Sequence, residues 1–460
     1  MKSAVILAAG ESNGTWPFSG IRQKATMPVL NVPMVRRLAQ HLVSLGIQEI
    51  AVVTGHRAEA VRACLGDLDQ VRFVTQPAPR GPVDAALHGL DGVRGESVVL
   101  CCGDIVTPRE TLAAAVETLD RGDAEALLVV APCPEDAPHW TNVEVSADGL
   151  IAGVIGHENR SLPRFGGIAA ARTDTLRRYL LRNPGMMTQV SIGAMPPVEG
   201  DIAQSFDLMR QDGMEVLALE AKGFLVDVDR PWQIVEANYA AGRYEVQNRK
   251  ETFIAEGAQI DDGACIAEGA KLWLGPGARI GRGCHIKGAV TLGAGVRVEN
   301  GAILGADVTV GAHTVMRDYC SVSSGSVIGA NAIVSHCAEF TGVALDTVYL
   351  YHYCCVTGLL GLNVDIGAAT VCGTLRFDDG VRTQMVKGHK EHPARFGDFT
   401  YIGDYTRTGV NVMFMPGVKV GYYSCVGAGA IVYEDVPERT LLLPKQEQVR
   451  KEWGPEKYGW

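Results

Sequence analysis

The sequence lacks any apolar run that approaches the ~18 residues of a membrane-spanning helix, so no membrane span is expected. Long runs of lysine or arginine are also missing, and the formal net charge of −10 argues against nucleic acid as the main partner. Met1 leads into an apolar segment expected to form a strand, which argues against a signal peptide. We therefore expect a cytoplasmic protein that associates with neither membranes nor nucleic acid.

The 12 cysteines match no pattern typical of a zinc site or of a disulfide framework. Adjacent pairs such as Cys354 and Cys355 fall in expected strands or coils, so reduced cysteines that fill the interior are the better interpretation. A metal site that combines His336 and Cys337 with His352 and its neighbours stays an alternative, although the spacing does not favour it.

Glycine, in contrast, is abundant, and a repeat of six residues accounts for much of it. Apolar residues stand six apart without a miss at Leu274, Ile280, Ile286, Leu292, Val298, Leu304, Val310, Met316, Val322, Ile328 and Val334. Neither a helix nor an ordinary strand repeats at six, whereas a parallel β-helix with three flat faces does. We expect the glycines that follow inward positions to take a positive φ in the turns; they are Gly275, Gly281, Gly293, Gly305, Gly311 and Gly329.

The same spacing continues on both sides, at Ile254, Ile260, Ile266 and Leu272 and then at Leu360, Ile366, Ile402, Val420, Val426 and Val432. The sequence therefore predicts a left-handed parallel β-helix domain over residues 250–440, followed by a tail over 441–460. Residues 378–397 interrupt the repeat, as a loop that projects from the coils would. A separate domain is expected over residues 1–245.

The first 245 residues alternate between strand-like and helix-like segments. Strands are expected at 4–8, 50–54, 71–74, 98–102, 126–130 and 223–226, and helices at 34–45, 83–90 and 111–120. Such alternation favours a Rossmann-like α/β fold with a mostly parallel sheet covered by helices. Ligands of such sheets bind beyond the carboxyl ends of the strands.

Polar and small residues follow three of these strands. A glycine-containing loop follows the first strand and leads to Lys24, a combination that can surround phosphates. Asp104 and Asp227 each end an apolar strand and present a carboxylate that suits a magnesium ion. An ordinary turn, a solvated lysine and helix-capping aspartates remain the alternative interpretations of the separate motifs.

Together these residues resemble the sugar-1-phosphate nucleotidyltransferases, and with the repeat of six the chain is similar to the two-domain uridylyltransferase/acetyltransferases, particularly the archaeal type. The nucleotide-binding signature is matched by Leu7, Ala8, Ala9, Gly10 and Lys24. The segment from Gln76 to Gly81 is similar to the one that recognises a pyrimidine base, and Glu158 and Gly167 to the sugar-binding residues.

The resemblance implies a reaction in which a sugar 1-phosphate attacks the α-phosphorus of a nucleoside triphosphate and pyrophosphate leaves. It implies Mg²⁺ on Asp104 and Asp227, phosphate contacts by Lys24, and UTP or dTTP as the favoured nucleotide. Several positions depart from the family pattern. Gly14 stands where an arginine usually contacts the triphosphate, Asn159 replaces a lysine, and Arg22 compensates only if the loop folds back.

The second half resembles the acetyltransferase domain of the same proteins, in which a histidine deprotonates an amine for attack on acetyl-CoA. His352 aligns with that histidine, although Thr374 replaces an expected asparagine. The resemblance also implies a homotrimer. Three functions therefore stay open: sugar-1-phosphate nucleotidyl transfer, which we favour, acetyl-CoA-dependent N-acetyl transfer to an amino-sugar phosphate, and a non-catalytic scaffold that binds sugar or nucleotide.

Overall fold

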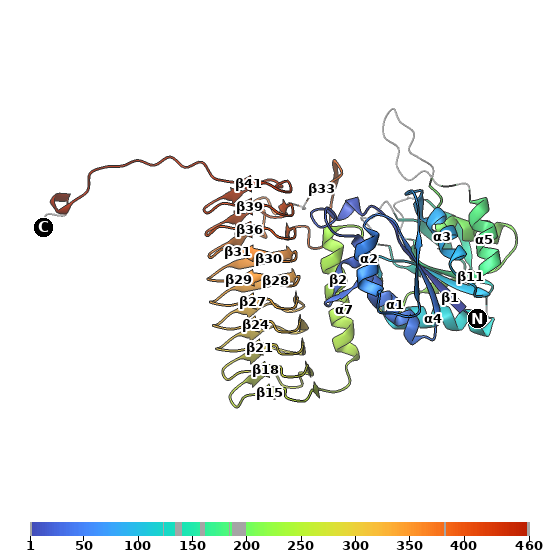
Figure 1. Ribbon diagram of the computed structural model, residues 1–460, viewed down its shortest axis with the longest axis horizontal. Helices are drawn as coiled ribbons and strands as arrows, with labels where there is room; N and C mark the ends of the chain where they lie inside the picture. Colours follow the sequence, from blue (N-terminus) through green and yellow to red (C-terminus); the bar gives the residue numbers. More distant parts are fainter. Residues whose placement is uncertain are drawn as a thin grey trace.

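The computed structural model describes residues 2–122, 124–133, 140–156, 162–183, 185, 199–380 and 383–457. An α/β domain and a solenoid of stacked coils lie side by side, and the long helix α7 (Pro231–Asn248) runs between them (Figure 1). The other helices of the α/β domain are α1 (Met34–Ser44), α2 (Ala58–Leu65), α3 (Gly81–Asp91), α4 (Arg109–Arg121), α5 (Thr173–Arg182) and α6 (Ile202–Gln211), with 3-10 turns η1 (Asn13–Thr15) and η2 (Lys24–Thr26).

The strands of the α/β domain form one large sheet and two short pairs. They are β1 (Lys2–Ala8), β2 (Pro28–Val29), β3 (Val32–Pro33), β4 (Glu49–Thr54), β5 (Val71–Thr75), β6 (Ser97–Cys102), β7 (Ile105–Val106), β8 (Ala126–Ala131), β9 (Asn142–Val145), β10 (Ile151–Ile155), β11 (Arg164–Arg172), β12 (Val216–Glu220) and β13 (Val226–Asp227). The large sheet has the order β10-β9-β11-β6-β1-β4-β5, and β8 joins β11 to β12 beside this path. Apolar residues on both of its faces pack against helices, which confirms the α/β fold.

One expectation about the strands of this domain was wrong. The strand expected at 223–226 consists only of Val226 and Asp227, paired with β7, while the strand β12 that precedes it was missed. The expectation of a mostly parallel sheet is confirmed, because only β10 and β11 run opposite to the other strands of this sheet. Local apolar patterns do not reveal strand direction, so the sequence did not show which strands run opposite to the others.

The solenoid is built from short parallel strands stacked coil on coil. They are β14 (Phe253–Ile254), β15 (Gln259–Ile260), β16 (Cys265–Ile266), β17 (Leu272–Leu274), β18 (Arg279–Ile280), β19 (His285–Ile286), β20 (Val290–Leu292), β21 (Arg297–Val298), β22 (Ile303–Leu304), β23 (Val308–Val310), β24 (Val315–Met316), β25 (Ser321–Val322), β26 (Val327–Ile328), β27 (Ile333–Val334), β28 (Glu339–Ala344), β29 (Tyr349–Leu350), β30 (Cys355–Leu360), β31 (Asp365–Ile366), β32 (Val371–Cys372), β35 (Thr400–Ile402), β36 (Arg407–Thr408), β37 (Met413–Phe414), β38 (Lys419–Val420), β39 (Cys425–Val426), β40 (Ile431–Val432) and β41 (Leu441–Leu442). A short 3-10 turn, η3 (Pro455–Lys457), lies in the tail. The loop that interrupts the repeat forms the hairpin β33 (Gln384–Val386) and β34 (His389–Glu391).

The stacking confirms the repeat of six. Ile280 pairs with Val298, Val298 with Met316 and Met316 with Val334, so each coil consists of three six-residue repeats. All eleven apolar residues of the unbroken series are buried, none more than 1% exposed. The inward aliphatic side chains form one continuous core along the axis of the solenoid.

The expectation about the turn glycines was wrong in its cause. None of the six named glycines has a positive φ; that conformation falls two residues later in the turn, at Gly277, Gly283 and Gly295 and at non-glycine residues such as Asp307. The named glycines are needed because the next coil passes close by. A Cβ on Gly305 would lie 2.4 Å from the backbone nitrogen of Ser324, and one on Gly329 would lie 2.4 Å from that of Asp346.

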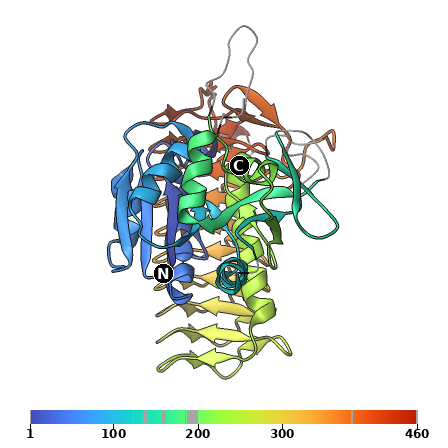
Figure 2. The same ribbon diagram turned by 90° about the vertical axis from the view of Figure 1, so that its right-hand side faces the viewer.

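The two domains share an apolar cluster, which we call the joint core. From the first domain it takes Phe18, Met27, Val29, Leu30, Met34, Val106, Val226, Val228, Trp232, Ile234, Val235, Ala237 and Ala241, and from the solenoid Val327, Val343, Leu345, Leu359, Val386, Phe399 and Tyr401. Helix α7 carries much of it and lies along the coils in both views (Figures 1 and 2). The domains are therefore packed firmly against each other.

No disulfide joins the cysteines of the described residues, as expected from the sequence. None of the helices in that part of the chain has the length and apolarity of a membrane span.

Candidate active site

The carboxyl ends of β1 and β6 lie next to each other, because the two strands are parallel neighbours in the sheet. The backbone N–H of Gly103 donates to the carbonyl oxygen of Leu7 at 2.8 Å, which holds the loop after β6 against the loop after β1. A Cβ on Gly103 would lie 2.7 Å from that oxygen, so this contact needs a glycine. Asp104 follows directly and is thereby placed beside the glycine-containing loop.

Asp227 reaches the same place through a short antiparallel pairing. Asp227 in β13 pairs with Ile105 in β7, and the backbone N–H of Val228 donates to the carbonyl oxygen of Asp104 at 3.1 Å. This pairing joins two segments that lie more than a hundred residues apart in the sequence. The structure thus brings Asp104 and Asp227 together.

A third carboxylate completes the cluster, which we call the acidic triad: Asp104, Asp227 and Asp229. Each can offer an oxygen such that all three atoms lie within 4.8 Å of one another, and all three side chains are partly buried. The sequence analysis did not select Asp229. Its signal was available, because residues i and i+2 of an extended segment project to the same side. Carboxylate oxygens at this spacing suit a hard divalent cation.

Lys24 contacts the triad directly. Its Nζ lies 2.6 Å from Asp104 Oδ2 and 2.5 Å from Asp229 Oδ1. Burial lowers the pKa of the Lys24 ammonium, but the three carboxylates raise it by more, so its pKa lies well above the ordinary value. Lys24 is therefore charged and offsets part of the repulsion within the triad.

Burial is also the main cause that raises the pKa of Asp227, to about 8, and the charges of Asp229 and Asp104 raise it further. Arg164 and Lys24 act in the opposite direction and offset only part of the increase. A bound dication would supply the positive charge that the triad still lacks.

Arg164, the first residue of β11, lies close to Asp227. The sequence analysis did not select it. Its Nη1 lies 3.9 Å from Asp227 Oδ2, and its guanidinium lies 4.0 Å from the centre of the Trp140 ring. Arg164 is 2% exposed, and burial lowers its pKa. A charged group is costly to bury, so this arginine indicates a functional environment.

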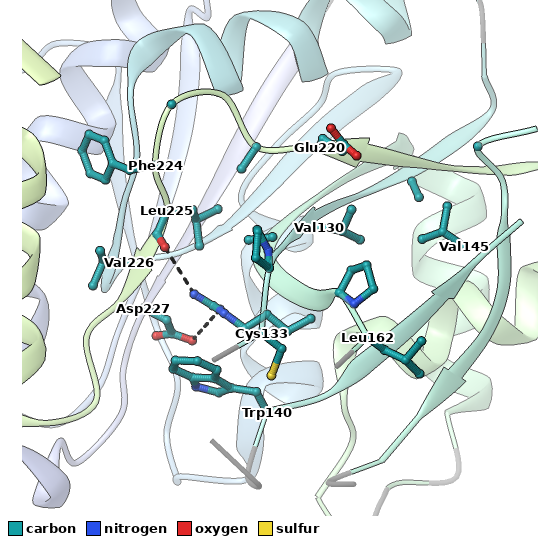
Figure 3. Close-up of a pocket in the computed structure, with 18 of the residues that line it drawn as sticks. Val130, Cys133, Trp140, Val145, Leu162, Glu220, Phe224, Leu225, Val226 and Asp227 are labelled. Atoms are coloured by element: carbon teal, nitrogen blue, oxygen red, sulfur yellow. Dashed lines mark hydrogen bonds and ion pairs between the residues drawn. The ribbon is translucent and has the colours of Figure 1, made fainter. Parts of the chain in front are cut away.

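A pocket of about 920 Å³ opens next to Asp227 and is lined by Arg164, Trp140, Glu220 and Gln233 among others. The Arg164 guanidinium donates to the carbonyl oxygen of Leu225 and lies beside Asp227. Figure 3 shows Asp227 and the Trp140 ring close together at this pocket. The volume falls within the range of small-molecule sites. The pocket therefore has room for a ligand in contact with a carboxylate of the triad.

The glycine-containing loop lies next to the triad. Ala8 ends β1 and Ala9 is buried, whereas a Cβ on Gly10 would meet no atom within 4 Å, so space for a ligand exists there. The hydroxyl of Ser12, which has a left-handed backbone, accepts a hydrogen bond from the backbone N–H of Lys24 at 3.1 Å. The loop and the lysine are thus held in a fixed relation.

Gln76 and Gly81 lie beyond the carboxyl end of β5, which β4 separates from β1 in the sheet. Gln76 follows β5 and is buried, and its Nε2 donates to Asp84 Oδ2 at 2.7 Å and to the carbonyl oxygen of Gly81 at 3.2 Å. Gly81 begins α3 with a φ of +86°. The amide orientation is therefore fixed by the helix that follows.

The two sugar-binding candidates are placed differently. Gly167 has a φ of +71°, and a Cβ there would lie 2.6 Å from Ile105 Cγ1, so it packs against the strand that positions Asp104. Glu158 lies outside the described residues.

Arg22, which was expected to compensate for the missing loop arginine only if the loop folds back, is engaged by the solenoid. Its Nη2 donates instead to Asp404 Oδ2 of the solenoid at 2.6 Å. The position of Gly14 is approached by another arginine, since a Cβ on Gly14 would lie 2.7 Å from Nη1 of Arg230.

His352 lies on an exposed solenoid turn with a φ of +55°. Its ring lies 4.6 Å from that of His336, which in turn lies 3.8 Å from Asp318. Within the described residues, the acidic triad is the only group of three or more His, Cys, Asp or Glu side chains spaced to hold a metal ion. The alternative metal site around His336 is therefore not found there.

The chain is similar to known proteins over most of its length. The family model described as a MobA-like NTP transferase domain matches residues 4–160. The bifunctional protein GlmU of Methanococcus vannielii is 26% identical over 455 residues, which cover 97% of this chain and 99% of that protein. The bifunctional sugar-1-phosphate nucleotidylyltransferase/acetyltransferase of Sulfurisphaera tokodaii is 24% identical over 434 residues, with 94% and 98% covered.

Among solved structures, the UDP-glucose pyrophosphorylase of Acinetobacter baumanii aligns with a TM-score of 0.43 and 17% identity, over 54% of this chain and 95% of that chain. Residues 4–160 thus resemble the MobA-like NTP transferase domains, and the chain as a whole is similar, over nearly its full length, to the bifunctional GlmU proteins.

Proposed function

We propose that the protein transfers a nucleotidyl group from a nucleoside triphosphate to a sugar 1-phosphate, giving a nucleoside-diphosphate sugar and pyrophosphate. The observation that carries this proposal is the acidic triad with Lys24 beside the glycine-containing loop, at the carboxyl edge of an α/β sheet. The S. tokodaii relative is named for the same activity, sugar-1-phosphate nucleotidylyl transfer.

The proposed reaction needs no covalent intermediate with the protein. An oxygen of the sugar 1-phosphate attacks the α-phosphorus, and the bond to the β-phosphate oxygen breaks, so that pyrophosphate carries the electron pair away. Asp104, Asp227 and Asp229 would hold Mg²⁺, which supplies charge neutralisation between the two phosphates when bound. Lys24 exchanges its carboxylate partners for phosphate oxygens, and the backbone around Gly10 encloses the phosphates.

Gln76 supports a preference for UTP or dTTP. The hydrogen bonds to Asp84 and Gly81 use both N–H groups of the Gln76 amide and leave its Oε1 to accept a hydrogen bond from the imide N–H of uracil or thymine. The pocket next to Asp227, with the Trp140 ring and the Arg164 guanidinium, is the space that we assign to the acceptor. Its aromatic and polar lining suits a polar ring.

Pyrophosphate release tests the proposal. The protein is incubated with Mg²⁺ and each pairing of UTP, dTTP, ATP, CTP and GTP with a panel of sugar 1-phosphates, and products are identified by mass. We expect release with at least one pairing and the corresponding nucleoside-diphosphate sugar as product. No release with any pairing would reject the proposed function.

We expect the apparent affinity for Mg²⁺ to rise with pH between about 6 and 8. The raised pKa of Asp227 means that a proton competes with the metal for this carboxylate throughout that range. Each pH unit below the pKa is expected to weaken binding by up to about tenfold. Calorimetric titration with Mg²⁺ at pH 6, 7 and 8 measures the effect, and an affinity independent of pH would show that Asp227 is already ionised.

The raised pKa of Asp227 also makes the stability of the fold depend on pH. A carboxyl group with a higher pKa in the folded state binds more protons there than in the unfolded state, so the metal-free fold gains stability as the pH falls through 8. Mg²⁺ should remove this gain because it displaces the proton.

Acetyl transfer by the solenoid is a second candidate function, favoured by the name of the S. tokodaii relative and by the exposure of His352. His352 would act as the base toward an amino-sugar phosphate, with acetyl-CoA as donor. Release of the CoA thiol is the measurement. Release that persists unchanged in His352→Ala would exclude this histidine.

We also propose that the solenoid assembles a homotrimer. Exposed apolar side chains on the coils, including Trp273, Val371 and Ile431, support a covered face. Sedimentation equilibrium distinguishes three copies from one.

A further inference from the structure

The hairpin β33–β34 belongs to the solenoid in sequence but packs against the first domain. Val386 joins the joint core together with Trp232 of α7. The base of the hairpin is fixed to the coils, because Gln384 Nε2 donates to the carbonyl oxygen of Gly417 at 3.0 Å and Lys419 Nζ donates to Gln384 Oε1 at 2.6 Å. The hairpin is therefore a rigid extension of the solenoid toward the first domain.

Its last residue, Glu391, holds Arg230 in a bidentate pair. Arg230 Nε lies 2.7 Å from Glu391 Oε2, and Nη2 lies 2.8 Å from Oε1. Both side chains are largely shielded, with exposed fractions of 17% and 21%. A bidentate pair of this kind fixes the plane of the guanidinium as well as its position.

The fixed guanidinium lies between the acidic triad and the glycine-containing loop. Its Nη1 donates to the carbonyl oxygen of Asp229 at 3.0 Å. The same Nη1 lies 2.7 Å from the point where a Cβ on Gly14 would stand, so only the absence of a side chain there leaves room for it. Three of the five N–H groups of Arg230 are thus engaged by Glu391 and Asp229, and one N–H on each of Nη1 and Nη2 remains for a ligand.

We propose that Arg230 binds the phosphates that leave as pyrophosphate, and that Glu391 of the solenoid positions it, so that both domains contribute to one transfer site. With the α-phosphate at the triad, the other two phosphates extend along the glycine-containing loop, past Gly14, and reach this guanidinium. The inference rests on the proposed function, which supplies the triphosphate.

Kinetics of full-length variants test the proposal. Arg230→Gln is expected to raise the KM for UTP, or for whichever triphosphate the wild type uses, by about tenfold or more, since a charge-assisted contact is lost. The KM for the sugar 1-phosphate should change less than about twofold. Arg230→Lys should restore part of the loss, because it keeps the charge but not the bidentate geometry. Glu391→Gln should raise the same KM by about threefold to tenfold through a misplaced guanidinium.

Arg22→Gln is the matched control, because it breaks another arginine pair between the domains, with Asp404, and leaves the carboxylates of the triad unchanged. Its KM for the triphosphate should stay that of the wild type. A merely structural bridge predicts instead that Arg230→Gln and Arg22→Gln lower the unfolding temperature and leave every KM unchanged. That result would overturn the inference.

Calorimetry with Mg²⁺ and UTP separates this inference from the proposed function. If the wild type binds the nucleotide without releasing pyrophosphate, the proposed function fails. A loss of affinity in Arg230→Gln would then still support the phosphate contact, and equal affinity would overturn it. If the wild type binds none of the five triphosphates, both proposals are rejected.

Discussion

Asp104→Asn is expected to lower pyrophosphate release by about a thousandfold or more, because it removes one of the three carboxylates that would hold the metal and one of the two carboxylates that contact Lys24. The amide has almost the same shape as the carboxylate. The backbone contact of Asp104 with Val228 and the contact of Gly103 with Leu7 do not depend on the side chain. The fold should therefore survive the change.

The same variant should change the unfolding temperature little, and this separates a functional role from a structural one. The loss of the ion pair with Lys24 destabilises the fold, but the repulsion within the triad falls at the same time. Steady-state pyrophosphate release and thermal unfolding are measured on the same preparation. Asp91→Asn, which breaks an exposed surface pair with Arg177, serves as the control and should keep full activity. Full activity in Asp104→Asn would reject the triad as the site.

Gly342→Ala is expected to lower the free energy of unfolding of the solenoid by about 3 kcal/mol or more. A Cβ on Gly342 would lie 2.0 Å from the carbonyl oxygen of Gly358 in the next coil, and one on Gly358 would lie 2.1 Å from that of Thr400. Gly342 also has a φ of +133°. Backbone atoms on stacked coils cannot move aside as a flexible side chain can, so the coils must separate.

Gly283→Ala provides the matched comparison for the clash. Gly283 has a φ of +75° in a solenoid turn, but a Cβ there would meet no atom within 4 Å. This variant carries the conformational cost without the steric one, about 1 kcal/mol. Denaturant midpoints followed by circular dichroism rank the two variants. Equal midpoints would mean that the coils at Gly342 adapt to the added methyl group.

The solenoid was predictable from the sequence because its repeat is itself the geometry. Each inward position, such as Leu304 or Val310, recurs at the distance that closes one face, and no contact outside the repeat is needed to recognise it. The conformation of the turns was less visible. Gly305 and its equivalents are demanded by the next coil rather than by their own φ, and such a reason is not encoded locally.

The candidate site was predictable only in part. Asp104 was recognisable at the end of an apolar strand, but its meeting with Asp227 depends on the β7–β13 pairing between two-residue strands too short to show a pattern. Asp229 was detectable from its spacing. Arg230 could not be recognised as a candidate from the sequence, because its position is fixed by Glu391, which lies 161 residues further along the chain.

The joint core has a consequence for how such a protein can be divided or recombined. The joint core is buried only while both domains are present. If either domain is removed, the other exposes the apolar side chains that it contributes to this cluster. Replacing the α/β domain by that of a distant homologue would require compensating substitutions on the solenoid coils that face it. A substitution on one side of the joint core alone disturbs its packing. Substitutions on the two sides are therefore expected to accompany each other.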